Sequence, residues 1–354
     1  MSAAHSGCHC SLIPPYVFDQ LARNTTGIAQ EAAIEALQID ANFRALRQAA
    51  PDLRGTMRGG ALAADAGGRQ RQVFDCQNRE TTNGPLLRGE GGAPVSDAAA
   101  NEAFDGIGAT YDFFAEIFKR ESIDDEGLAL KGYVHYGRRY NNAFWDGQRM
   151  VFGDGDGVIF NSFTSAVDVI GHELTHGVTE DEAGLVYFRQ PGALNESMSD
   201  VFGSMVKQYV RGQTSAEADW LIGEGIFAPG INGTALRSMK APGTAYDDPK
   251  LGRDPQPDHL SKLVETTRDN GGVHINSGIP NRAFYLVATA LGGHSWERAG
   301  LIWYEALRDS KLRSTSGFRA FARVTVAVAT GRFGVGSDEA TAVTQGWAEV
   351  GVKV

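Results

Sequence analysis

Two histidines lie four residues apart in the segment Val167-Asp-Val-Ile-Gly-His-Glu-Leu-Thr-His-Gly-Val, whose apolar pattern predicts a helix over 165–181. His172 and His176 would share one face of that helix, and two imidazoles at this spacing can bind one zinc ion. Glu173 could reach a water on the open side of the metal. By composition alone this motif arises in roughly one such chain in a hundred, so by itself it is moderate evidence. Two surface or capping histidines are the alternative.

A carboxylate further along the chain can complete a metal site of the catalytic type. Glu196 lies twenty residues beyond His176, in Gly192-Ala-Leu-Asn-Glu-Ser-Met-Ser-Asp. Two His and one Glu leave the fourth zinc position to water, whereas a structural zinc site has four protein ligands. Zinc lowers the pKa of its water towards ~7, and Glu173 could accept the proton as the hydroxide attacks a carbonyl. The ligand set therefore indicates hydrolysis of an amide.

Further polar residues could support this chemistry. Asp200 and Asn195 are suited to hydrogen-bond the far nitrogens of the ligand histidines, although helix capping or solvent exposure is an equal alternative. Asp269 precedes His274 by five residues, with two glycines between them that allow a sharp turn. Asp269 could orient the His274 imidazole for donation to an oxyanion, and the hydroxyl of Tyr187 could donate as well. A single histidine is more often structural, so this motif is weak alone.

The elements that must position these residues change in type along the chain. Residues 27–50 have the apolar spacing of an amphipathic helix, and the glycine-rich stretch that follows suits a flexible linker. The segment from about 72 to 165 is expected to be mainly strand, with one helix near 102–118. From residue 165 onward the pattern becomes helical. Helices are expected near 165–181, 194–211, 276–292, 296–309 and 316–330.

Composition excludes several classes of function. The 354 residues carry 33 basic and 43 acidic side chains without a basic block, so we expect no nucleic-acid partner. No apolar stretch reaches about 18 residues, and we expect no membrane span. The N-terminal sequence MSAAHSGCHCSLIPP lacks the basic start and apolar core of a secretory signal. A nucleotide-dependent enzyme is opposed by the absence of both GxxxxGK[ST] and a strand-linked GxGxxG.

Taken together, the motifs resemble those of the thermolysin-like metallopeptidases. The matching segments are HELTH at 172–176, GALNESMSD at 192–200, DNGGVHINSG at 269–278, YNNAFWDGQRMVFGDGDG at 140–157 and LRSM at 236–239. Their order and gaps agree, and the resemblance extends over essentially everything after about residue 72. It implies an α+β fold with a β-rich N-terminal lobe at 72–186, a helical C-terminal lobe at 187–354 and the zinc site in the cleft between them.

The resemblance also assigns roles to individual residues. His172, His176 and Glu196 resemble the zinc ligands, Glu173 the base, and Tyr187 and His274 the transition-state stabilisers, with Asp200 and Asp269 as their supports. Positions that hold the substrate backbone are Asn142, Ala143, Trp145 and Arg237. A pocket for a bulky apolar residue after the scissile bond would be lined by Phe160, Phe163, Val169, Ile222 and Leu236, for which ordinary core packing is the alternative. The implied function is a neutral zinc endopeptidase acting on peptides and proteins; a catalytically silent zinc-binding homologue is the alternative, which the presence of Glu173 opposes.

The N-terminal part resembles the short propeptide of the protealysin-like subgroup. Its motif reads Ser11-Leu-Ile-Pro-Pro-Tyr-Val-Phe, and two prolines would hold such a peptide extended at low entropic cost. The resemblance implies that residues 1–53 are an intramolecular inhibitor, released by cleavage in the linker at 54–71. Ile13, Pro14, Pro15 and Tyr16 would contact the active-site cleft. Cys8 and Cys10, with His5 and His9, could instead supply a thiolate to the zinc, although a mobile tail is the simpler expectation.

The sequence also bears on calcium binding and on the location of the protein. Lys207 and Leu221 stand where thermolysin itself uses carboxylates for a paired calcium site, although Asp168, Asp219 and Glu224 remain, and Thr234 replaces a further acidic ligand. A lysine ammonium would repel a dication and could replace part of its charge, so we expect no calcium requirement. The resemblance suggests a secreted protein, with a cytoplasmic one as the alternative, and we expect a monomer.

Overall fold

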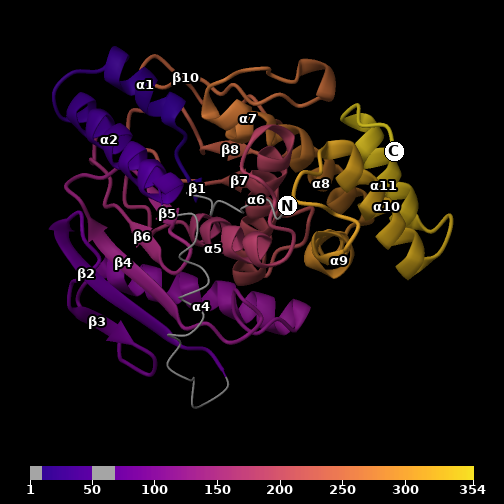
Figure 1. The fold of residues 1–354 in the computed structure, drawn as a ribbon, viewed down its shortest axis with the longest axis horizontal. Helices are drawn as coiled ribbons and strands as arrows, with labels where there is room; N and C mark the ends of the chain where they lie inside the picture. Colours follow the sequence, from indigo (N-terminus) through magenta and orange to yellow (C-terminus); the bar gives the residue numbers. More distant parts are fainter. Residues whose placement is uncertain (1–9, 50–67) are drawn as a thin grey trace. The chain divides into compact units, whose positions relative to one another are not determined.

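The computed structural model of the protein describes residues 10–49 and 68–354 (Figure 1). They form two compact units: one runs up to Val178 and includes Gly225–Ile231, and the other comprises Thr179–Glu224 and Asn232–Val354. The first unit contains a six-stranded sheet together with helices, and the second unit is mainly helical, so the predicted α+β class is confirmed. Cys8 and most of the expected linker at 54–71 lie outside the described residues, and the lobe boundaries at 72–186 and 187–354 stay predictions.

The first unit is built on a six-stranded sheet in the order β1-β5-β6-β4-β2-β3. Its strands are β1 (Cys10–Ser11), β2 (Arg71–Arg79), β3 (Leu86–Gly89), β4 (Leu130–Tyr136), β5 (Ala143–Trp145) and β6 (Met150–Phe152). The β2–β4 and β4–β6 pairs are parallel, and the other pairs are antiparallel. Because β1 comes from the N-terminal segment, β5 would be an edge strand without it.

Helix α4 (Ala98–Phe118) packs on β2 and β4. Asp97 caps its N-terminus by accepting the Ala100 N–H at 3.1 Å, which places the start of the helix upstream of the 102–118 that apolar spacing predicts. Gly132 on β4 permits the close packing, because a Cβ there would lie 2.9 Å from Cδ1 of Ile107.

The N-terminal segment forms two helices, α1 (Pro15–Asn24) and α2 (Ile28–Ala49), which lie side by side in Figure 1 and are joined by a hydrogen bond from the Gln30 side chain to the Ala22 carbonyl. The helix expected over 27–50 is confirmed. The expectation of an extended peptide through Tyr16 is wrong, because Pro14 is the last extended residue and Pro15 opens α1. Proline suits the first helical position, where its missing N–H has no intrahelical partner to lose.

The second unit is mainly helical. Its helices are α6 (Arg189–Arg211), α7 (Asp269–Asn276), α8 (Gly278–Leu291), α9 (Leu301–Arg308), α10 (Phe318–Phe333) and α11 (Asp338–Glu349). Two short antiparallel pairs accompany them: β7 (Leu221–Ile222) with β8 (Arg237–Ser238), and β9 (Asp247–Asp248) with β10 (Gly252–Arg253). The core includes Trp303 and Trp347, whose rings stack at 6.0 Å between centroids. Sequence spacing did not predict α11, although the N-cap Ser337 followed by two acidic residues is a start signal.

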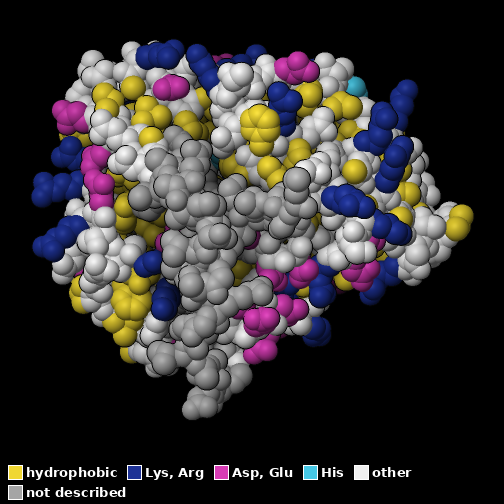
Figure 2. All heavy atoms as spheres, in the orientation of Figure 1, with side chains coloured by type: hydrophobic (Ala, Val, Ile, Leu, Met, Phe, Trp, Pro, Cys, Tyr) yellow, Lys and Arg dark blue, Asp and Glu magenta, His cyan; other side chains and the backbone are white. Residues whose placement is uncertain are grey.

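In the described part of the chain, no helix has both the length and the apolar character that crossing a membrane requires. On the face that Figure 2 shows, Lys and Arg side chains lie at several places, a number of them close together towards the right, with acidic and uncharged side chains elsewhere on the face. The expectation of no nucleic-acid partner stays a prediction.

His135 links three parts of the first unit. Its Nδ1 lies 2.9 Å from the Asp154 carboxylate, and its Nε2 lies 2.7 Å from Oδ2 of Asp97, the residue that caps α4. The hydrogen bond to Asp154 raises the pKa of His135 to about 9, with Asp97 adding to this against the opposing effect of burial. The imidazole is therefore protonated at neutral pH and ties β4 to the start of α4 and to the loop around Asp154.

We predict that His135→Gln destabilises the fold more at pH 6 than at pH 9.5. The folded pKa of about 9 exceeds the unfolded value of about 6.5, so the stabilisation is complete below about pH 6.5 and is lost as the pH rises through 9. The contacts of His135 with Asp154 and with Asp97 are partly exposed, so the expected loss at pH 6 is about 1 kcal/mol in the free energy of unfolding. Urea unfolding in a Glu173→Ala background, which limits self-digestion, measures it. An equal loss at both pH values would contradict the protonated state of His135 at neutral pH.

Candidate active site

Helix α5 (Val167–Asp181) presents the two histidines of the predicted zinc motif. The helix packs closely on α4, because Gly106 leaves room for Ile170: a Cβ on Gly106 would lie 2.3 Å from Cδ1 of Ile170. His172 and His176 are both buried, and their Nε2 atoms lie 3.1 Å apart with the rings nearly perpendicular. The helical spacing predicted from sequence therefore brings the two imidazoles together.

This nitrogen pair fits a shared cation. Two facing Nε2 atoms can form a hydrogen bond when one of them carries the proton, and when both carry lone pairs they need a shared positive partner. A metal ion that takes one lone pair from each nitrogen satisfies both at once.

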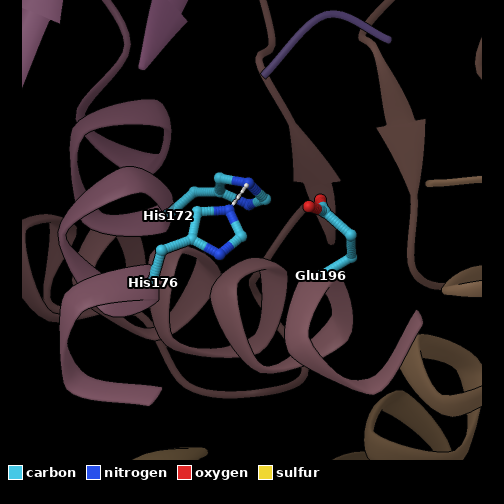
Figure 3. Close-up of side chains that lie close together, drawn as sticks. All are labelled: His172, His176 and Glu196. Carbon is cyan, nitrogen blue, oxygen red and sulfur yellow. Dashed lines mark hydrogen bonds between the residues drawn. The ribbon is translucent and has the colours of Figure 1, made fainter. Parts of the chain in front are cut away.

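The third predicted ligand, Glu196, lies on α6 and is fully buried. One atom each from His172, His176 and Glu196 lie within 4.8 Å of one another. Figure 3 shows the two imidazole rings side by side, with the Glu196 carboxylate turned towards them. Two imidazoles and one carboxylate are a zinc donor set of the catalytic type, so these residues fit the metal predicted from sequence.

Glu173 is held by the last residue of strand β5. Its side chain is fully buried, and Oε2 accepts the backbone N–H of Trp145, the last residue of β5, at 3.1 Å. The predicted base and the strand expected to bind the substrate backbone are thus in direct contact.

Tyr187 and His274 converge on Glu196. The Tyr187 hydroxyl donates to Oε1 of Glu196 and lies 3.1 Å from Nε2 of His274. The same His274 nitrogen is 3.4 Å from Glu196 Oε1. These contacts place both predicted oxyanion donors beside a predicted metal ligand.

Asp269 fixes the orientation of His274. Oδ1 of Asp269 lies 2.5 Å from Nδ1 of His274, and Oδ2 accepts the backbone N–H of His274 at 2.9 Å. The turn has left-handed backbone at four successive residues, of which Gly271 and Gly272 adopt φ of 83° and 80°. Burial alone would lower the pKa of His274, but the negative charges of Glu196 and Asp269 outweigh it and raise the pKa to about 9.

Asp200 and Arg237 form a buried pair. Both nitrogens of an Arg237 fork donate to the Asp200 carboxylate at 2.8 Å, and Asn281 donates to the same carboxylate at 2.8 Å. The Asn195 amide donates to the Leu185 carbonyl at 3.3 Å. The expected roles of Asp200 and Asn195 in orienting the ligand histidines, and of Arg237 in holding substrate, stay predictions.

The residues assigned to the hydrophobic pocket are buried in the units to which they belong. In the first unit the rings of Phe160 and Phe163 lie 5.7 Å apart. In the second, the Leu236 N–H donates to the Ile222 carbonyl at 2.9 Å. Val169 is fully buried on α5. Their part in a substrate pocket stays a prediction.

The predicted backbone-binding residues of β5 hold the chain's own N-terminal segment. Strand β1 pairs antiparallel with β5, and the Leu12 N–H donates to the Ala143 carbonyl at 3.1 Å. The Asn142 side chain accepts the Ile13 N–H at 2.9 Å and donates to the Ile13 carbonyl at 3.2 Å. Leu12 and Ile13 are both fully buried.

Two residues of this contact were missed by the sequence analysis. Leu12 lies within the motif but was not among the residues expected to contact the cleft; its place next to Ile13 in an extended segment was the available signal. Asp40 on α2 accepts from Tyr140 and Asn142. It lies four residues after Ala36 on the buried face of the helix, where an acidic residue needs a partner.

Comparison with known proteins agrees with this geometry. The sequence matches the family models of the thermolysin metallopeptidase catalytic domain over residues 53–180 and of the thermolysin metallopeptidase α-helical domain over residues 183–352. The two models together cover most of the chain, which therefore belongs to the thermolysin family of zinc metalloendopeptidases.

Relatives similar over nearly the whole chain indicate the subgroup. An extracellular metalloprotease of Pectobacterium carotovorum subsp. carotovorum is 53% identical over 345 residues, 98% of this chain and 97% of the relative. Protease PrtS of Photorhabdus sp. (strain Az29) is 44% identical, covering 97% and 92%. The solved precursor of protealysin, a metalloproteinase from Serratia proteamaculans, is 52% identical with a TM-score of 0.88, covering 97% of this chain and 99% of that one. The alternative of a silent homologue finds no support among these proteases.

Two buried carboxylates at the site are expected to respond differently to substitution. We predict that Glu196→Ala loses zinc, because one of three protein ligands is removed. Glu173→Ala should keep the metal and lower the rate of peptide cleavage by about 10² to 10⁴-fold. Zinc content after dialysis and cleavage of a chromogenic peptide, both on the trimmed protein, measure the two effects. Stoichiometric zinc in Glu196→Ala, or unchanged cleavage by Glu173→Ala, would refute the respective assignment.

Proposed function

We propose that this chain is the self-inhibited precursor of a neutral endopeptidase that cleaves peptide bonds on the N-terminal side of bulky hydrophobic residues. The observation that carries the inhibitory part is the occupation of β5 and Asn142 by residues 10–13. A peptide substrate that adds a strand to β5 would need the same backbone groups, so the two compete.

The catalytic roles follow from the side chains at the site. His172, His176 and Glu196 would hold the zinc ion, which would supply Lewis-acid chemistry for the hydrolysis of the peptide bond. Glu173 accepts the proton of the attacking water and passes it to the leaving amine, while the Trp145 N–H keeps its carboxylate in place.

Two further side chains can stabilise the developing oxyanion. The hydroxyl of Tyr187 and Nε2–H of His274 lie 3.1 Å apart and can both donate to it. Asp269, at 2.5 Å from Nδ1, keeps the imidazole oriented so that Nε2 faces the reaction. We therefore treat Asp269 as a positioning residue for His274.

Preference for bulky apolar residues rests on the family resemblance and on the apolar character of all five pocket positions. The Pectobacterium relative is named an extracellular metalloprotease, and we extend secretion to this chain. We propose a monomer that acts on peptides and proteins, with its own N-terminal segment as intramolecular inhibitor.

Latency is the direct test of this function. We predict that the intact 354-residue chain cleaves peptide at a small fraction of the rate of the same protein after limited trimming removes about the first 50 to 70 residues. The physical reason is that substrate cannot pair with β5 while residues 10–13 occupy it. Mass spectrometry of the N-terminus alongside the cleavage assay relates activity to length. Full activity of the intact chain would rule out self-inhibition.

We further propose that an internal cation replaces calcium. Nζ of Lys207 lies 2.8 Å from Oδ1 of Asp219 and 2.6 Å from the Leu221 carbonyl oxygen, and the side chain is almost fully buried. Arg211 lies 3.1 Å from Asp219 and 3.4 Å from Glu224. An ammonium among these oxygens supplies the positive charge that a dication would otherwise bring.

The expected result is that selective calcium chelation, with zinc buffered at constant activity, changes the melting temperature by less than about 2 °C. Lys207→Glu should lower the melting temperature because it places a carboxylate beside Asp219, and added calcium should restore part of the loss. Differential scanning calorimetry with and without calcium measures both. A large calcium-dependent shift in the unsubstituted protein would show that Lys207 does not replace the ion.

A further inference from the structure

One carboxylate of the N-terminal segment is bound inside the first unit. Asp40, on α2, has no exposed surface. Its Oδ1 accepts the Tyr140 hydroxyl at 2.7 Å, and its Oδ2 accepts Nδ2 of Asn142 at 3.2 Å. Burying a carboxylate is costly unless donors replace its water, and these two contacts provide such donors.

The contact helps to orient the Asn142 amide, together with the Ala143 backbone N–H, which donates to the amide oxygen at 3.0 Å. A carboxylate accepts hydrogen bonds and cannot donate them, so the amide must turn its NH₂ group towards Asp40. The amide oxygen then faces the Ile13 N–H, at 2.9 Å, and the NH₂ group also reaches the Ile13 carbonyl at 3.2 Å. One side chain thus bridges α2 and the segment that lies on β5.

Tyr140, the second donor, is fixed by packing. Its ring lies edge-on to those of Tyr136 and Phe144, at 5.5 and 6.2 Å between centroids, and the residue is buried. Burial and then the charge of Asp40 raise the pKa of the phenol well above its usual value, so it stays protonated and can donate.

We propose that Asp40 is the latch of the precursor: by binding Tyr140 and Asn142 it holds the Asn142 amide in the orientation that binds Ile13, and so couples the release of residues 10–13 to the release of α2. The inference rests on the proposed self-inhibition and names the residue that maintains it. Four hydrogen bonds depend on one another: one from Tyr140 to Asp40, one from Asn142 to Asp40 and two between Asn142 and Ile13. Once the segment is removed, the Asn142 amide becomes available to the backbone of a substrate.

The test uses full-length protein with Asp40→Ala, and Glu31→Gln on the exposed side of the same helix as the matched control. A bond to a charged group is worth about 1.5–3 kcal/mol, which corresponds to a rise of about tenfold or more in peptide cleavage by intact Asp40→Ala precursor. Glu31→Gln should match the unsubstituted precursor. After trimming, all three proteins have lost the substituted residue and should cleave at the same rate, which separates a loss of latency from a defect in the catalytic part.

Tyr140→Phe gives an independent arm, because it removes the other end of the Asp40 contact. It should raise precursor activity in the same direction, and the Asp40→Ala, Tyr140→Phe double variant should gain less than the product of the two single increases. In a Glu173→Ala background, hydrogen exchange at the Leu12 and Ile13 amides should accelerate in both single variants. If Asp40→Ala fails to fold, Asp40→Asn, which keeps the side-chain size, and Tyr140→Phe carry the same comparison.

The outcomes separate the latch from the function on which it rests. A fully active intact precursor without substitution would overturn self-inhibition. A latent precursor whose Asp40→Ala, Asp40→Asn and Tyr140→Phe variants are equally latent, with unchanged amide exchange, would overturn the latch alone.

Discussion

The rest of the structure depends on two imidazole nitrogens held 3.1 Å apart in a buried site, with a buried carboxylate within reach. Such a group of polar atoms is stable inside a protein only when each is satisfied, and a zinc ion held by the three side chains would satisfy all of them at once. The neighbouring elements serve that arrangement. Gly106 lets α5 pack closely on α4, α6 carries the carboxylate, and the Trp145 N–H holds the side chain of Glu173, the proposed base.

In the proposed function, strand β5 links catalysis and latency through the same backbone groups. A peptide that lies along this strand forms main-chain hydrogen bonds whatever its sequence, which is useful for a protease and makes its own N-terminal segment an effective competitor. Being part of the same chain gives that segment a high effective concentration, so modest contacts suffice to hold it. Asp40 adds a contact of specific chemistry to these general ones.

Much of this could be predicted from the sequence, because helical periodicity and the spacing of His172, Glu173 and His176 are local features. Three errors and omissions have different causes: the first two concern local signals at the start of a helix, and the third concerns a long-range contact. Pro15 opens a helix although prolines also favour extended chain; α11 has a weak apolar stripe and depends on the cap at Ser337; and Asp40 finds its donors a hundred residues away, at Tyr140. Long-range partners of single polar residues cannot be derived from local pattern. The resemblance to family motifs, in contrast, predicted which residues distant in the sequence belong to the site.

The most direct measurement of the central claim is anomalous diffraction from crystals of the full-length protein, recorded on both sides of the zinc absorption edge. The account predicts one strong zinc peak about 2.0–2.1 Å from Nε2 of both His172 and His176 and about 2.0–2.2 Å from an oxygen of Glu196. No zinc peak at that position in crystals grown with the metal, or a zinc ion bound there without one of these three side chains, would contradict it.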